Sequence, residues 1–279
     1  MYDLYYVRKR RRRRIAALVS LIASIGVASL VVTSFLGRNT GTFTIKVVNN
    51  DVRLSLSRTS DFQESTTYLH IDQILPLREC SYADILRGVN EIDNESVNDI
   101  SEFNAVNMDE QGNADSVYYM KYTFFVKNSG FSAAEYNFSL NFSDRTKSTD
   151  GTERMLDDTL RVMVYDTDLS SGENHTVRGV WAKDSPYTHY DKNNNPTHRE
   201  FIGIRPYDEH ETDEYELAKS FNSGTTILNF SVPGFSSEAV RRYTIVFWLE
   251  GDDKESKPDE GIPQGASVKI GVNIDAFKI

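Results

Sequence analysis

Cysteine is almost absent from this sequence of 279 residues, since Cys80 is the only one. A single thiol cannot form a disulfide within the chain, so any domain that the chain forms must be stabilised by core packing. Cys80 itself is open to two interpretations. It is either an ordinary buried residue or a thiol able to react or to pair with another chain.

The sequence also lacks the short motifs of common catalytic sites. Its five histidines do not form the His-Glu-x-x-His pattern, which sets two zinc ligands one helical turn apart with a general base between them. There is neither a Gly-x-Ser-x-Gly elbow for a serine nucleophile nor a glycine-rich loop for a phosphate. Asp157 and Asp158 are adjacent, so in a strand their carboxylates would point to opposite faces and make a poor acid–base pair. The sequence therefore predicts no catalytic residue.

What the sequence does contain is a basic run followed by an apolar run. Residues 8–14 are all Arg or Lys, and residues 15–36 carry no charge. As a helix, these 22 residues would span about 33 Å, close to the roughly 30 Å hydrocarbon core of a bilayer. Because Lys and Arg beside a span stay in the cytoplasm, we predict a cytoplasmic segment at 1–14, a single-pass transmembrane helix at 15–36 and an extracellular domain at 37–279.

Two fates of the apolar run remain open. It is retained in the lipid bilayer as a signal-anchor, or it is cleaved as a secretory signal and the domain is secreted. Length favours retention, because the run exceeds the usual apolar region of a signal peptide, about 7 to 15 residues. No Ala-x-Ala site follows it, and the small-residue triplets ending at Ser29 and Ser34 are weak substitutes. An exported domain without disulfides suits the surface of a Gram-positive cell.

The charge balance excludes one class of partner. The chain has 31 basic and 41 acidic residues and a net charge of −10, and the basic residues include all of 8–14. The part beyond the apolar run is therefore strongly acidic. Such a surface repels nucleic acid, so we expect no nucleic-acid partner.

Beyond residue 38, apolar and polar residues alternate, as in a strand with one buried face. The clearest example is 134–142, where Tyr136, Phe138 and Leu140 alternate with polar residues. Further strands are predicted at 43–47, 52–56, 118–126, 160–165, 177–182, 225–232, 243–250 and 267–277. Helix signals are few, with one short helix expected near Ser81. We therefore predict an all-β fold, an antiparallel β-sandwich resembling a jelly roll.

Two pairs of these strands are predicted to form hairpins. The first joins 43–47 to 52–56 through Asn49-Asn50-Asp51, and the second joins 118–126 to 134–142 through Lys127-Asn128-Ser129-Gly130. Both connections are rich in residues that favour turns.

Two long polar stretches, near 84–116 and 183–216, interrupt the pattern and are predicted to be insertions. Aromatic side chains in the second insertion either bind a partner or cover the edge of the sandwich. They are Tyr187, His189, Tyr190, Phe201 and Tyr207.

The second insertion contains a calcium candidate. Asp191, Asn193 and Asn195 place oxygen ligands at alternate positions, as the start of a calcium loop does. The match ends there, because Pro196 replaces the glycine and Ile202 the bidentate glutamate of such a loop. Two interpretations therefore remain, a weak calcium site and a hydrated turn.

The same insertion holds the residues of one catalytic alternative. His189 and His198 can converge with Asp191 or Glu200 if the loop folds suitably, because three-ligand zinc sites are also assembled from loops. The alternative function is therefore a loop-built metal-dependent hydrolase.

After the apolar segment come four stretches with a familiar order. They are the strand at 41–48, Lys127-Asn128-Ser129-Gly130, Leu160-Arg161-Val162-Met163-Val164 and Tyr243-Thr244-Ile245-Val246-Phe247-Trp248-Leu249-Glu250-Gly251. This order resembles that of exported Gram-positive proteins related to TasA and camelysin. The resemblance implies a jelly-roll ectodomain, a surface or biofilm-matrix role and fibre assembly. Camelysin is described as a metalloprotease, but no residue here matches a zinc motif, so that activity is not carried over.

We therefore expect a non-enzymatic surface protein, membrane-anchored or secreted, with a role in adhesion, matrix or envelope structure. Its expected partners are the lipid bilayer, through residues 15–36, and a cell-surface partner or a second copy, joined through the N-terminal strand. No cofactor is expected apart from the candidate calcium. The alternative remains a camelysin-like metalloprotease.

Overall fold

The structure of the protein is a computed structural model. It describes residues 42–47, 53–70, 77–82, 85, 106–108, 114–149, 153–172, 176–191, 193–203, 217–251, 263 and 265–278. The chain divides into two compact units, Met1–Thr40 and Gly41–Ile279. The predicted basic segment and transmembrane helix belong to the first unit and lie outside the described residues. Among the residues that the structure describes, no helix has the length and apolar character needed to cross a membrane.

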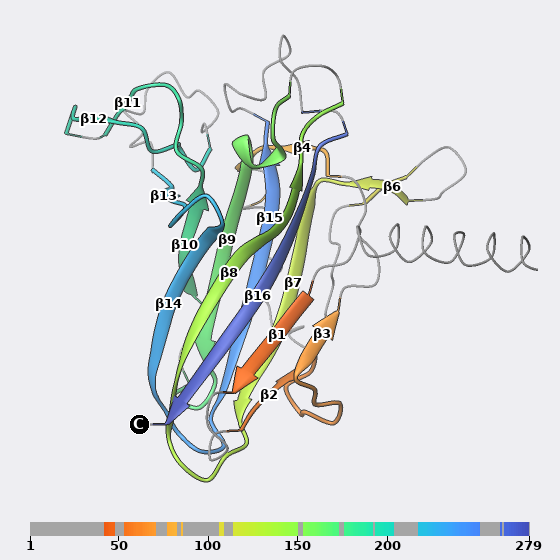
Figure 1. Ribbon diagram of the computed structural model, residues 1–279, viewed down its shortest axis with the longest axis vertical. Helices are drawn as coiled ribbons and strands as arrows, with labels where there is room; N and C mark the ends of the chain where they lie inside the picture. The colour runs from red at the N-terminus through yellow and green to blue at the C-terminus, as the bar shows by residue number, and fades with distance from the viewer. Residues whose placement is uncertain are drawn as a thin grey trace, which may run out of the picture. The chain divides into compact units, whose positions relative to one another are not determined.

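The second unit is built of strands, which confirms the all-β prediction (Figure 1). In chain order the strands are β1 (Thr42–Val47), β2 (Leu54–Ser57), β3 (Tyr68–His70), β4 (Glu79–Cys80), β5 (Val106–Met108), β6 (Ala114–Val117), β7 (Tyr119–Asn128), β8 (Ala134–Thr146), β9 (Leu160–Asp168), β10 (Thr176–Ala182), β11 (His189–Tyr190), β12 (Pro196–Thr197), β13 (Lys219–Ser220), β14 (Thr226–Phe235), β15 (Val240–Glu250) and β16 (Ser267–Lys278). A 3-10 helix, η1 (Leu156–Asp158), precedes β9. Each strand predicted from alternation is present.

Two large sheets contain most of these strands. The five-stranded sheet has the order β14-β8-β16-β1-β3, and the seven-stranded sheet has the order β13-β10-β9-β15-β7-β2 with β4 beside β15. The prediction of wholly antiparallel sheets is wrong, because β1 runs parallel to β16, β13 to β10 and β4 to β15. These pairs join strands that are distant in sequence, so no tight turn imposes an antiparallel direction.

Both predicted hairpins are also wrong. β1 pairs with β16 and β3, whereas β2 pairs with β7 in the other sheet. β7 and β8 likewise belong to different sheets, and β8 pairs with β14 and β16. A strand can bury its apolar face against the opposite sheet whichever strands it pairs with in its own sheet. Alternation therefore does not specify the pairing.

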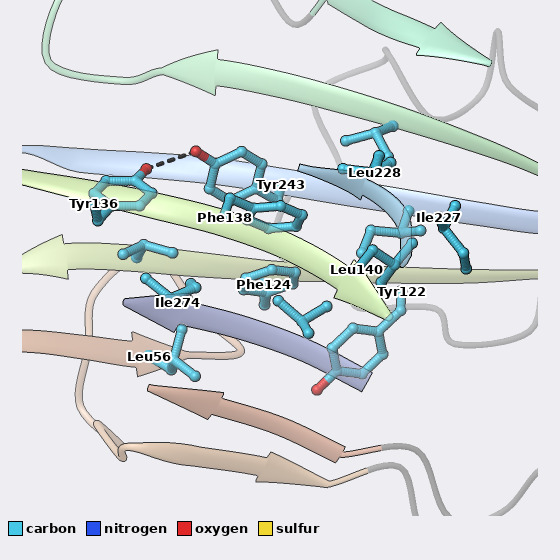
Figure 2. Close-up of a cluster of buried hydrophobic side chains, with 14 of the residues drawn as sticks. Leu56, Tyr122, Phe124, Tyr136, Phe138, Leu140, Ile227, Leu228, Tyr243 and Ile274 are labelled. Atoms are coloured by element: carbon cyan, nitrogen blue, oxygen red, sulfur yellow. Dashed lines mark hydrogen bonds between the residues drawn. The ribbon is translucent and has the colours of Figure 1, made fainter. Parts of the chain in front are cut away.

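The faces of β7 and β8 meet across the principal core (Figure 2). Phe138 of β8 stacks at 4.8 Å on Phe230 and lies 6.4 Å from Phe124 of β7 between ring centroids. The hydroxyls of Tyr136 and Tyr243 share a 2.6 Å hydrogen bond between the sheets. Burial raises the pKa of Tyr243 well above its usual value, so this phenol stays neutral. The two sheets therefore pack face to face around aromatic side chains.

The seven-stranded sheet is covered on its outer face as well. Val246 and Trp248 point away from the principal core, yet both are fully buried. They pack with Cys80, Ile85 and Ile202, which come from segments that fold back over the sheet. A strand covered on both faces is apolar at nearly every position, as 243–249 is apart from Thr244.

The two predicted insertions are described in part. From the first, the structure describes Ile85 and the short β5–β6 pair. The N–H of Ile85 donates to the carbonyl oxygen of Ser81 at 3.1 Å, so a helical turn stands where a short helix was expected. From the second it describes 183–191 and 193–203, which carry β11 and β12. Tyr207 lies outside the described residues.

Candidate functional site

The three calcium candidates lie together in the turn between β11 and β12. Asp191 Oδ1 accepts hydrogen bonds from the backbone N–H groups of Asn193 (2.9 Å) and Asn195 (2.8 Å), and Oδ2 accepts one from Asn195 Nδ2 (3.1 Å). Asn194 has φ +61°, which asparagine tolerates better than most residues. The carboxylate thus closes its own turn. Within the described ranges, no group of three or more His, Cys, Asp or Glu side chains is placed to hold a metal ion. Calcium at this turn stays a prediction.

Two of the four candidate zinc ligands do converge. His189 Nε2 lies 3.6 Å from Glu200 Oε2. His198 does not join them, because its Nδ1 lies 3.1 Å from the carbonyl oxygen of Tyr187 in an exposed position. The His189 ring also packs edge-on against Phe201 at 4.8 Å. The rings of His189 and Phe201 therefore pack against each other within the insertion.

Arg161 completes this cluster from β9. Its side chain is only 1% exposed, and its Nη2 lies 3.6 Å from the same Glu200 oxygen that faces His189. Its Nε donates a 3.0 Å hydrogen bond to the carbonyl oxygen of Phe201. A guanidinium is a permanent cation, so a metal ion at that oxygen would lie beside a like charge. The arrangement is suited to fixing the loop on the sheet.

The end of the loop approaches β15 closely. A Cβ added at Gly203 would lie 2.3 Å from Tyr82 Cβ and 3.0 Å from Glu250 Oε2, so only glycine fits. The same Glu250 oxygen accepts a 2.8 Å hydrogen bond from the indole N–H of Trp248. Tyr82 in turn stacks on Trp248 with 6.0 Å between centroids. The end of the insertion therefore packs with the outer core, the side chains that cover the outer face of the seven-stranded sheet.

Asp157 and Asp158 lie in η1 and not in a strand, which corrects the expected geometry. Asp157 is buried and accepts a 2.8 Å hydrogen bond from Arg145 Nη1. Lys183 Nζ lies 2.5 Å from Asp158 Oδ1 and 3.7 Å from Asp157 Oδ2. Burial alone would lower the pKa of Lys183, but the two carboxylates outweigh it and the pKa is raised. The ion pair therefore persists until the pH rises through that raised pKa.

Cys80 is buried at the end of β4 and belongs to the outer core. Its thiol lies 3.6 Å from the carbonyl oxygen of Ser81. A buried thiol in apolar surroundings is a poor nucleophile, which favours the interpretation as an ordinary buried residue.

The N-terminal strand forms a second candidate site. β1 is bonded along its whole length to the last strand, from Thr42 opposite Gly271 to Val47 opposite Ala276. On its other side it pairs with β3, with Thr42 opposite His70. The first strand of the domain therefore pairs with its last strand.

Arg161 is the residue that sequence reasoning missed. It stands between Leu160 and Val162 in an apolar run, and an arginine inside such a strand needs a buried acceptor. That signal is readable in the sequence. Its partner Glu200 is 39 positions away in an insertion, so the pairing is not readable.

No protein-family model matches the chain, and no curated protein matches it significantly. The resemblance to proteins related to TasA and camelysin therefore stays a prediction from the stretches quoted above.

Proposed function

We propose that the protein is a non-enzymatic surface protein, anchored in the membrane or secreted, that acts in adhesion, matrix or envelope structure and assembles through β1. The strand order supports a jelly-roll-like fold, because β1-β16-β8-β14 and β7-β15-β9-β10 form two facing sheets, and among these strands the chain changes sheet at every step except from β9 to β10. β1 departs from a fully antiparallel jelly roll by running parallel to β16. The basic and apolar runs at 8–14 and 15–36 support an external location.

The observation that carries this proposal is the position of β1. Its partners, β16 and β3, do not adjoin it in sequence, so no tight turn ties it to its own sheet. Retained on an anchor, β1 completes the sheet of its own chain. Freed by cleavage, the same strand can pair with β16 of a neighbouring copy. That contact is head-to-tail and does not close on itself, so it grows into a fibre.

A chain beginning near Asn39 is expected to polymerise slowly, and the full-length chain is expected to stay monomeric or dimeric in detergent. Deleting residues 39–48 removes the donor strand, so it should abolish polymerisation and lower the free energy of unfolding. Light scattering and chemical denaturation measure the two effects.

Added peptide provides the matched control. The peptide GTFTIKVV should restore stability to the shortened chain and leave it unable to grow. The same peptide with Thr44→Pro and Lys46→Pro lacks two backbone donors and should restore nothing. Fibres from the chain that lacks 39–48 would rule out β1 as the link.

Protease added to intact cells is expected to remove the domain beyond Arg38 and to leave residues 1–14 intact, because the positive charges hold that end inside. Mass spectrometry of the membrane fraction detects the surviving peptide. Survival of the domain with loss of 1–14 would reverse the topology.

A metal-dependent hydrolase remains the second candidate function. The observation that favours it is the 3.6 Å approach of His189 Nε2 to Glu200 Oε2, a separation that one bound zinc ion can bridge. The guanidinium of Arg161, 3.6 Å from the same oxygen, opposes a second cation there. Elemental analysis of the purified protein separates the two candidates, since the hydrolase requires bound zinc and the structural role does not.

A further inference from the structure

A pocket of about 210 Å³ lies between the turn after β9 and the β14–β15 connection. Figure 1 shows the β14–β15 connection at the end of the long strands away from the β11–β12 hairpin. The walls of the pocket come from the turn after β9 and from the end of β14 with the connection to β15. Drug-sized ligands occupy roughly 300 Å³ or more, so this pocket suits a smaller group. It shares no residue with β1 or with the cluster of His189 and Glu200.

One wall is charged. Arg241 is 17% exposed, and its Nε lies 3.4 Å from Asp166 Oδ1, while the other oxygen of Asp166 bonds Arg178 Nη1 at 2.5 Å. Burial opposes the charge of Arg241, but Asp166 outweighs it and the pKa of Arg241 is raised. The guanidinium is therefore a fixed donor at the pocket wall.

The turn after β9 supplies hydroxyl and carboxylate groups. Asp168 Oδ1 accepts the backbone N–H of Ser170 at 3.0 Å, and Ser170 Oγ accepts the N–H of Val240 at 3.0 Å. Ser170 thus keeps its hydroxyl proton for another acceptor. Across the described chain, Asp168 Oδ2 and the Ser236 hydroxyl make no hydrogen bond. The pocket therefore offers acceptors as well as donors.

The other wall is apolar, and the β7–β8 loop hydrogen-bonded to it carries an exposed aromatic ring. Val232 and Phe235 line the pocket. Phe131 is 98% exposed on the β7–β8 loop. That loop is fixed to the β14–β15 connection, because Asn128 Nδ2 donates 2.9 Å hydrogen bonds to the carbonyl oxygens of Ser132 and Phe235. A ring held outward on a fixed loop is a ready surface for stacking.

We propose that this pocket and Phe131 bind one unit of a neutral saccharide. A sugar hydroxyl both donates and accepts, which matches the mixture of Arg241, Asp168 and serine hydroxyls. The apolar face of a pyranose ring suits an exposed aromatic side chain. An anion fits less well, because Asp166 and Asp168 repel it. The Phe131 ring of a second copy fits less well too, because it would bury Arg241 and Asp168 without replacing their water.

The test is binding of neutral monosaccharides to the full-length chain in lipid nanodiscs, which carry no sugar detergent. Glucose, galactose, mannose and N-acetylglucosamine are titrated by saturation-transfer NMR, with glucuronic acid alongside. We expect one neutral sugar to bind with a Kd of about 1 mM, the range usual for a small ligand with few contacts. Asp168→Asn keeps the acceptor for Ser170 and should weaken binding about tenfold, as should Phe131→Ala.

Asp144→Asn is the matched control, because Asp144 is an exposed carboxylate on β8 outside the pocket. This variant should bind the neutral sugar with unchanged affinity. Thermal unfolding verifies that every variant is folded. Absence of binding by every neutral sugar would overturn the proposal. Tighter binding of glucuronic acid, strengthened by Asp168→Asn, would make this an anion site instead. A change of oligomeric state in Phe131→Ala without sugar binding would make it a self-association surface. None of these outcomes bears on assembly through β1.

Discussion

Phe138→Asp is expected to unfold the domain. Phe138 is fully buried in the principal core, beside Tyr243 (Figure 2). Its ring centroid lies 4.8 Å from those of both Phe230 and Tyr243. A carboxylate there has no cation to pair with among these aromatic neighbours, and it also leaves a cavity. Such changes cost more than about 4 kcal/mol, against a total stability of about 5–15 kcal/mol for a typical domain. Circular dichroism and urea denaturation measure the loss.

Asn137→Asp is the matched control one residue earlier. Asn137 is exposed on the opposite face of β8, and its side-chain oxygen accepts a hydrogen bond from Ser231 Oγ. An aspartate keeps that acceptor, so the free energy of unfolding should change by less than about 0.5 kcal/mol. Equal losses from the two substitutions would show that the face of β8 is assigned wrongly.

Arg161→Met is expected to cost about 3–5 kcal/mol, because it leaves the buried carboxylate of Glu200 without its cation. It also removes the donor to the Phe201 carbonyl oxygen, so the segment around 199–203 loses a second attachment to β9. Urea denaturation gives the stability. Adding Glu200→Gln removes the stranded charge, so the double variant should lose less than the sum of the two single variants.

Lys183→Met tests the same chemistry at a solvated ion pair. Lys183 is 43% exposed and bonds Asp158, so its loss should cost less than about 1 kcal/mol. A cost for Arg161→Met no larger than that of Lys183→Met would mean that the buried cluster contributes no more than a surface pair.

The positions and faces of the long strands were predictable because they depend on local pattern. Tyr136, Phe138 and Leu140 alternate with polar residues, and that period of two decides which face is buried, whatever the neighbouring strand is. The outer face of β15 was also signalled, since 243–249 is apolar at nearly every position. The cover over that face was not predictable, because it comes from segments that carry no strand pattern.

Neither the Arg161–Glu200 cluster nor the pocket beside Arg241 was predictable from the sequence as a group of residues. Arg161 and Glu200 are separated by 39 positions, and the pocket takes Asp168 from one turn and Arg241 from a strand far along the chain. Within these two groups, only His189 and Glu200 were predicted to converge, from their place in one insertion. Contacts between distant segments depend on how the sheets pack, and the alternation of apolar and polar residues does not specify that packing.

By itself the sequence determined the strand content, the buried face of each long strand, the need for a core without disulfides and the expectation of an external location. Each depends on short-range periodicity or on composition. The tertiary structure alone decided that β1 lies parallel to β16, that β7 and β8 face each other across a core, and that Arg161 meets Glu200. The last two outcomes depend on covering both faces of the seven-stranded sheet, and the first depends on which strands complete the five-stranded sheet. Each condition involves the whole domain and no single stretch of it.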